Sequence, residues 1–185
     1  GLRHAGSLGE VREAFDAEHG RRLALKVLRP EILADSAALE RLLVAAGWVS
    51  ALSHQNIAAL HSVTRAGAQV CLAYEFIDGK TLQSLLLNLR LLAWPESLRI
   101  VKCIGAALTH AHEKGIIHRQ IKPGNIMMTP SGEVKVLDFS VAHAAPGMPP
   151  YMAPEQAQGK VSPAVDLFAA SVCLYEMVTG ELPFK

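Results

Sequence analysis

The chain has 185 residues, half of them hydrophobic, which is enough for one or two compact units with a buried core. Its 18 lysines and arginines against 17 aspartates and glutamates give a net charge of +1. We therefore expect no nucleic-acid partner, because proteins of that class carry an excess of positive charge. The richest apolar stretch, residues 164–178, contains two acidic side chains. It is also shorter than the ~20 residues that cross a bilayer, so no membrane segment is expected in this fragment.

The number and spacing of the cysteines indicate the redox state of the cellular compartment. Cys71, Cys103 and Cys173 are odd in number, far apart and without C-x-x-C spacing, which favours a reducing, cytoplasmic environment over a disulfide framework. The chain has no signal peptide and does not begin with Met, so we expect it to begin inside a longer protein.

The first 76 residues are expected to form a small sheet that carries one helix. Asp35 or Ser36 is the expected N-cap of that helix, in which apolar residues recur at helical spacing from Leu39 to Leu52. Short runs of β-type residues, separated by turn residues, predict strands at 11–15, 23–28, 57–63 and 70–76.

The rest of the chain has a mainly helical pattern. Proline at the start and glycine after the end mark two long helices, with two short strands between them. The expected elements are a helix from Pro95 to Gly115, strands at 126–129 and 134–137, and a helix from Ser162 to Gly180. A sheet-rich part followed by a helical part predicts the α+β class.

The most specific motif lies between the first long helix and the two short strands. Residues 118–125 read HRQIKPGN, and residues 138–140, which begin thirteen positions after Asn125, read DFS. These segments resemble the catalytic loop H-R-D-x-x-x-x-N and the metal-binding turn D-F-G of protein kinases. Residues 152–155, MAPE, resemble a further kinase motif at the right distance and favour protein kinases over small-molecule phosphotransferases. Among protein kinases, the chain resembles the bacterial Ser/Thr kinases of the eukaryotic-like type.

The resemblance implies a two-lobed protein-kinase-like fold. A small antiparallel sheet lobe with one helix would comprise residues 1–76, and a hinge would follow at 77–80. A mainly helical lobe, truncated at its C-terminal end, would comprise residues 81–185.

The resemblance also implies a site for ATP and Mg²⁺ between the lobes. The adenine partners would be the Glu75 carbonyl and the Ile77 amide, with the bulky Tyr74 guarding the inner pocket. Protein kinases hold the metal through the loop Asn and the D-F-G Asp, which are Asn125 and Asp138 in this sequence. The residues assigned to nucleotide binding are Gly6, Gly9, Val11, Ala24, Lys26, Glu75, Ile77 and Met127.

The catalytic residues implied by the resemblance are Gln120, Lys122 and Asn125. A protein kinase has Asp at the position of Gln120, where it orients the acceptor hydroxyl and accepts its proton. A neutral amide can form a hydrogen bond but has no useful basicity. Loss of a positioned base typically costs ~10²–10⁴ in rate. We therefore expect inefficient phosphoryl transfer or none.

The lysine of the nucleotide site lacks its usual partner. In active kinases this lysine pairs with a Glu on the following helix, and that position is Ala45 here. Glu40 lies about 140° away around the helix, so it would need a rotation to reach Lys26. A pair between Lys26 and Asp138 is the expected alternative.

Two further departures concern the metal turn and the activation segment. Ser140 replaces the D-F-G glycine and should restrict the turn. Met148 stands where the family has a phosphorylatable Thr, so activation by phosphorylation at this residue is expected to be lost. By contrast, Asp166 resembles the buried helix Asp that braces the catalytic loop.

The sequence therefore predicts a pseudokinase that binds Mg·ATP and acts through its conformation or through binding to a partner. One alternative is a weakly active Ser/Thr kinase that transfers the γ-phosphate to protein hydroxyls. The other is an interaction module that binds no nucleotide. The sequence identifies neither a protein substrate nor a protein partner.

Overall fold

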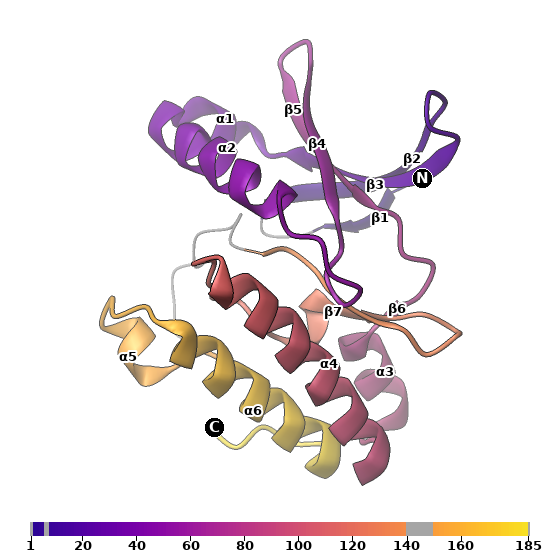
Figure 1. The fold of residues 1–185 in the computed structure, drawn as a ribbon, viewed down its shortest axis with the longest axis vertical. Helices are drawn as coiled ribbons and strands as arrows, with labels where there is room; N and C mark the ends of the chain where they lie inside the picture. The colour runs from indigo at the N-terminus through magenta and orange to yellow at the C-terminus, as the bar shows by residue number, and fades with distance from the viewer. Residues whose placement is uncertain (1, 6–7, 140–149, 185) are drawn as a thin grey trace.

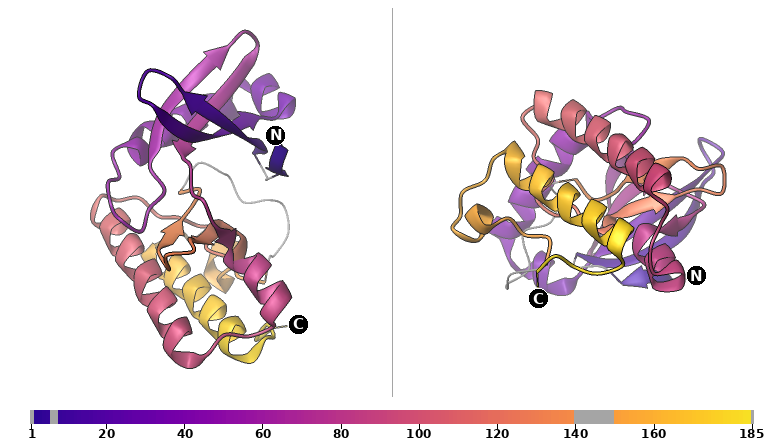
Figure 2. Two further views of the ribbon diagram at one scale, coloured as in Figure 1. Left: turned by 90° about the vertical axis from the view of Figure 1, so that its right-hand side faces the viewer. Right: turned by 90° about the horizontal axis from the view of Figure 1, so that it is seen from below.

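The computed structural model describes residues 2–5, 8–139 and 150–184. It has an antiparallel sheet lobe and a mainly helical lobe, as the α+β prediction required (Figure 1). Seen from the side, the sheet lies above the long helices of the second lobe, and the chain passes from one lobe to the other at the end of the sheet (Figure 2).

The sheet lobe is a five-stranded antiparallel sheet with two helices. The strand order is β1-β2-β3-β5-β4, and α2 packs against β4. The elements are β1 (Leu2–Ala5), β2 (Gly9–Asp16), β3 (Arg21–Leu28), α1 (Pro30–Ala34), α2 (Ser36–Ser50), β4 (Leu60–Ala66) and β5 (Gln69–Glu75).

The helix α2 begins where the sequence predicts. The side chain of Asp35 accepts a hydrogen bond from the Ala38 amide at 2.9 Å, which satisfies one of the free N–H groups of the first turn. Its buried residues, Leu42, Ala46 and Val49, recur at spacings of three and four and face the sheet.

Three features of this lobe differ from the expectation, and the first is the strand β1, which was not predicted. The sequence predicted one helix, but a five-residue helix, α1, precedes α2. It buries none of its residues and so leaves no periodic pattern in the sequence. The strand expected at 57–63 is β4, which begins at Leu60 and runs on to Ala66, and only Leu60 of its seven residues is buried.

The helical lobe is built around two long helices, α4 and α6, that pack against each other (Figure 1). Gly180 has φ 73°, a left-handed conformation that ends α6 as predicted. The elements are β6 (Lys80–Thr81), α3 (Leu82–Leu89), α4 (Trp94–Glu113), a 3₁₀ turn (Pro123–Asn125), β7 (Ile126–Met128), β8 (Val134–Val136), α5 (Pro154–Ala157) and α6 (Pro163–Thr179).

A short segment before β4 joins the two lobes. The Val136 amide donates to the Asn56 carbonyl at 2.8 Å, and the Ala58 amide donates to the Val136 carbonyl at 3.0 Å. The Asn56 side chain adds a bond to the Val134 carbonyl at 2.8 Å. Strand β8, which leads directly to the predicted metal turn, is thereby bonded to the chain that enters the sheet.

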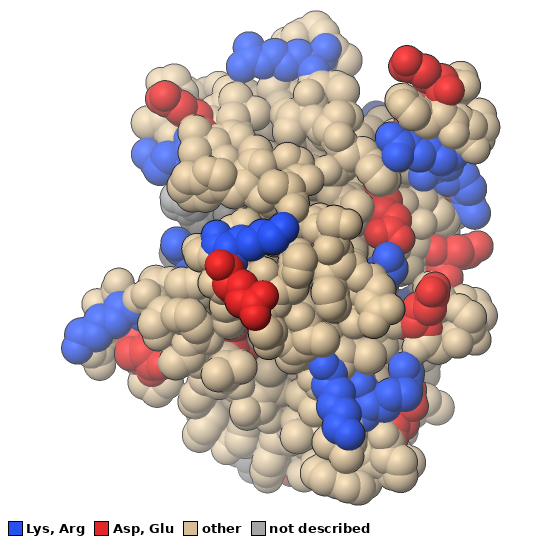
Figure 3. Space-filling view, viewed as in Figure 1, with Lys and Arg blue, Asp and Glu red and all other residues tan. Residues whose placement is uncertain are grey.

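The hydrophobic core continues through both lobes. Leu72 of β5, Phe139 and Ile104 of α4 belong to one cluster of buried side chains. The face drawn in Figure 3 shows positive and negative side chains interspersed. Within the described ranges, no helix combines the length and the apolar character needed to cross a membrane.

Candidate active site

The catalytic loop is organised around the buried imidazole of His118. Its Nε2 lies 2.7 Å from the Leu137 carbonyl, which can only accept, so Nε2 carries the proton. Its Nδ1 accepts from the Gln120 amide at 3.2 Å. Burial lowers the pKa of His118 despite the opposing charges of Asp166 and Asp138. The ring is therefore neutral near pH 7, as its two hydrogen bonds require.

Asp166 of α6 fixes the backbone at the start of the loop. Its carboxylate accepts hydrogen bonds from the amides of His118 at 2.8 Å and Arg119 at 2.7 Å. Arg119 has φ 67°, a left-handed conformation that costs energy for a non-glycine residue. These bonds confirm the predicted brace.

A third donor to Asp166 was not predicted. The Nε2 of His112, near the end of α4, lies 2.8 Å from the same carboxylate. No motif in the sequence assigns His112 to the brace. Its position six residues before the catalytic loop is the only sequence signal that could have suggested one.

Asn125 connects the loop to the strand that carries the metal turn. Its side-chain nitrogen donates to the Gln120 carbonyl at 2.9 Å, and its own carbonyl accepts from the Leu137 amide at 2.8 Å. Because the amide nitrogen is committed to the loop, the amide oxygen is the atom that remains for a ligand. Lys122, the third predicted catalytic residue, is exposed.

Lys26 and Asp138 form an ion pair across the two lobes. The lysine side chain is 7% exposed and the aspartate side chain 25%. Within the described residues this is the one ion pair that Lys26 makes, and Glu40 is exposed on α2. The alternative partner predicted for Lys26 is thus confirmed.

The metal turn has a constrained backbone. Asp138 has φ 60°, again left-handed for a non-glycine residue. The ring of Phe139, which is 1% exposed, packs on the ring of His118 with centroids 4.6 Å apart. The turn and the catalytic loop therefore hold each other in place.

The sheet brings several predicted nucleotide-binding residues to neighbouring positions. Val11 pairs with Lys26 between β2 and β3, and Ala24 pairs with Tyr74 between β3 and β5. At the start of β2, a side chain on Gly9 would lie 1.7 Å from the Val27 carbonyl oxygen, so only glycine fits. Met127 lies in β7 and is half-buried.

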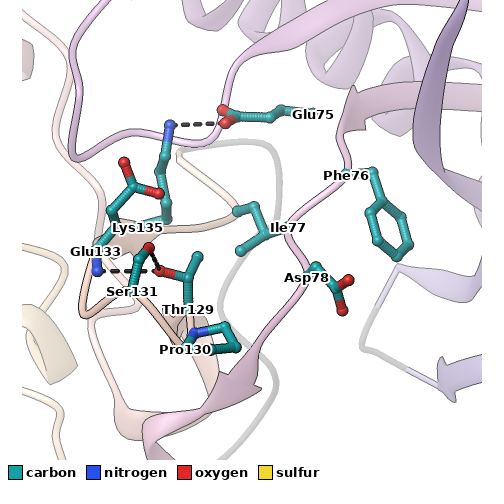
Figure 4. Close-up of a pocket in the computed structure, with 9 residues that line it drawn as sticks. All are labelled: Glu75, Phe76, Ile77, Asp78, Thr129, Pro130, Ser131, Glu133 and Lys135. Carbon is teal, nitrogen blue, oxygen red and sulfur yellow. Dashed lines mark hydrogen bonds and ion pairs between the residues drawn. The ribbon is translucent and has the colours of Figure 1, made fainter.

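The chain that leaves β5 borders a cavity of about 420 Å³ (Figure 4). The Glu75 side chain bonds to the Lys135 ammonium of β8 at 2.7 Å, and the cavity separates residues 75–78 from the turn after β7. Neither Lys26 nor Asp138 lines this cavity. The side chain of Glu75 therefore has a role in joining the lobes that the sequence analysis did not predict.

The predictions for Gly6, Ser140 and Met148 lie outside the described residues.

Comparison with known families agrees with this geometry. The model of the protein kinase domain matches residues 5–185. The chain belongs to the protein kinase family. Serine/threonine-protein kinase PknA of Mycobacterium tuberculosis is 37% identical over 196 residues, a match that covers 97% of this chain and 46% of the relative. Serine/threonine-protein kinase PknB of Mycobacterium leprae is 34% identical over 196 residues, covering 97% of this chain and 32% of the relative. The kinase domain described here therefore spans less than half the length of these relatives.

Proposed function

We propose that this kinase domain is a pseudokinase that binds Mg·ATP between its lobes and acts through its conformation or through a protein partner. The observation that carries the proposal is Gln120 in an otherwise complete catalytic loop. The backbone amide of Gln120 donates to the His118 ring, and the backbone carbonyl of Gln120 accepts from the Asn125 side chain. The loop therefore keeps its frame, while the side chain that would accept the substrate proton is a neutral amide.

The residues available for the nucleotide fit Mg·ATP. The carboxylate of Asp138 and the free amide oxygen of Asn125 are hard oxygen donors, and Mg²⁺ commonly binds through one or two such groups together with phosphates and water. A metal held by these two residues would supply positive charge that neutralises the phosphates. Lys26 would hold the α and β phosphates, since the ion pair with Asp138 keeps its ammonium beside the metal-binding carboxylate.

We further propose that the lobes are residues 1–76 and 81–185, joined by a hinge at 77–80. Strand β5 ends at Glu75 and β6 begins at Lys80, so the proposed hinge lies between two regular elements. The half-buried Ile77 in this segment would present its amide to adenine.

Thermal unfolding with ATP, with and without Mg²⁺, tests nucleotide binding. Nucleotide at a hundred times its Kd should stabilise the domain by about 2.7 kcal/mol. The stabilisation should require Mg²⁺ and should disappear in Asp138→Ala, but not in the control Asp16→Ala on the distant β2–β3 turn. No shift at millimolar ATP would contradict the proposal and favour the interaction module that binds no nucleotide.

A weakly active Ser/Thr kinase is the second candidate. It is favoured by the ordered packing of Phe139 on His118 and by the bonds from Asp166 to the loop. Both named relatives are serine/threonine-protein kinases. Phosphoryl transfer depends mainly on positioning and charge neutralisation, so some turnover can survive without the base.

Transfer of labelled phosphate to a generic protein acceptor distinguishes the two candidates. If the missing base limits the reaction, Gln120→Asp should raise the rate by ~10²–10⁴. Efficient transfer by the parent domain that is lost in Asp138→Ala would overturn the pseudokinase proposal. If Gln120→Asp restores no transfer in a folded protein, the other departures, including Ala45, are sufficient to abolish the reaction.

A further inference from the structure

Lys26 has an aromatic neighbour as well as its ion-pair partner. The Lys26 ammonium lies 5.7 Å from the centroid of the Tyr74 ring. In the register of β3 and β5, Lys26 pairs with Leu72 and Ala24 pairs with Tyr74, so Lys26 and Tyr74 are diagonal neighbours on one face of the sheet. A distance within about 6 Å is the range of a cation–π interaction.

The surroundings make this contact stronger than one at the surface. Tyr74 is 6% exposed and Lys26 is 5% exposed. Cation–π attraction is stronger when the ammonium is removed from water than when it is exposed. At the position of α2 where active kinases have the Glu that pairs with this lysine, this chain has Ala45, which cannot hold a cation.

The Tyr74 hydroxyl does not explain why the ring lies there. It is buried, and it has no hydrogen-bond partner among the residues that the structure describes. Burial raises its pKa well above the usual value, and the charge of Asp138 raises it further. An unpaired buried hydroxyl costs stability, so the benefit of this residue lies in its ring rather than in a bond from its hydroxyl.

We propose that Tyr74 is a positioning residue that takes over from the absent helix carboxylate, its ring face holding the Lys26 ammonium beside Asp138. This inference rests on the proposed function in one respect, namely that the contact would keep Lys26 ready for the nucleotide phosphates. The contact itself exists in the free protein and can be measured there.

A double-mutant cycle on the free domain tests the contact. Unfolding in urea is measured for the parent, Tyr74→Leu, Lys26→Met and the double variant. Tyr74→Leu should raise the equilibrium constant of unfolding, and the factor of this increase should be about 2- to 30-fold smaller when Lys26 is already Met. The cavity left by the smaller side chain is present in both backgrounds and cancels.

Two control variants distinguish a contact of Lys26 with the Tyr74 ring from a general effect of lost buried volume. Tyr74→Phe keeps the ring and removes the unpaired hydroxyl, so it should retain the full coupling with Lys26. Cys71→Ala removes buried volume from the opposite face of β5 and should show no coupling with Lys26→Met. Zero coupling for Tyr74→Leu, or coupling of equal size for Cys71→Ala, would overturn the inference.

Nucleotide affinity supplies the second readout. If the parent binds Mg·ATP, Tyr74→Leu should weaken binding by about 2- to 30-fold, and Tyr74→Phe should restore it. In the Lys26→Met background, Tyr74→Leu should weaken binding by a smaller factor than it does in the parent. If the parent binds no nucleotide, the proposed function fails, while the cycle on the free domain still decides whether Tyr74 holds Lys26.

Discussion

The catalytic loop in the helical lobe and the lysine site in the sheet lobe are held in different ways. The loop is fixed by several buried hydrogen bonds: Asp166 holds two backbone amides, and His118 and Asn125 each join the loop to Leu137. Among the residues that the structure describes, the Lys26 ammonium has one ion pair and one aromatic neighbour. The loop is therefore a rigid part of the fold, whereas the position of Lys26 depends on few contacts.

The bonds that fix the loop explain why Gln120 can stand in place of the catalytic Asp without disturbing the loop. The bonds of residue 120 to His118 and Asn125 come from its backbone, so they do not depend on which side chain it carries. His118, Asn125 and Asp166 use their side chains for the frame. In this loop, catalytic chemistry can be removed at one position while the structure is kept by the others.

The largest effect should come from removing the brace of the loop. Asp166→Ala leaves two backbone amides and His112 without their acceptor in a buried site. We expect a loss of about 3–5 kcal/mol in the free energy of unfolding, measured in urea. Asp78→Ala, at a side chain that is 80% exposed, should change it by less than about 0.5 kcal/mol. Equal effects of the two variants would show that the loop is not held by Asp166.

A smaller effect should appear in the dependence of stability on pH. The pKa of His118 is lower in the folded protein than its usual 6.5, so the unfolded chain binds a proton that the folded one does not. Stability should be constant above about pH 7 and fall as the pH drops below 6.5, with a slope of at most about 1.4 kcal/mol per pH unit from this residue.

Two other histidines contribute to the same slope. Burial also lowers the pKa values of His54 and His61, so they act in the same direction. His118→Gln should therefore remove part of the slope between pH 7 and 5 in thermal unfolding, more than the exposed His61→Gln does. A slope that His118→Gln leaves unchanged would contradict the neutral, buried imidazole.

The smallest effect should come from the sheet lobe. Asp35→Ala removes the N-cap of α2 and should lower the free energy of unfolding by about 1 kcal/mol. Because α2 supplies no carboxylate to Lys26, the proposed binding of Mg·ATP should hardly change in affinity. A large loss of affinity, measured by titration of the folded variant, would mean that α2 orients Lys26 by another route.

Most of the fold could be predicted because its signals are local. The cap at Asp35, the proline at the start of α6 and the glycine at its end are short-range effects that the sequence displays. The four-residue β1 and the short α1 were not predicted. In α1 no residue is buried, so the sequence shows no periodic pattern there. The edge strand β4 is mostly exposed, which is why its boundaries were misplaced.

The site was predictable to the extent that motifs reveal it. The motifs predicted site roles for Lys26, Asn125 and Asp138 and a bracing role for Asp166. The ion pair of Lys26 with Asp138 was expected from the missing helix carboxylate. The bonds from His112 to Asp166 and from Glu75 to Lys135 were not predicted. They join residues 54 and 60 positions apart, and only the three-dimensional packing of α4, α6 and the lobes brings such residues together.

The short bridge at residues 56–58 has a mechanical consequence. It bonds to Val136, two residues before Asp138, and leads into β4, so Asp138 is tied to the sheet lobe as well as to its own lobe. If the lobes move about the proposed hinge at 77–80, this second tie should limit how far Asp138 moves from Lys26. We therefore expect movements between the lobes to leave the ion pair between Lys26 and Asp138 closed.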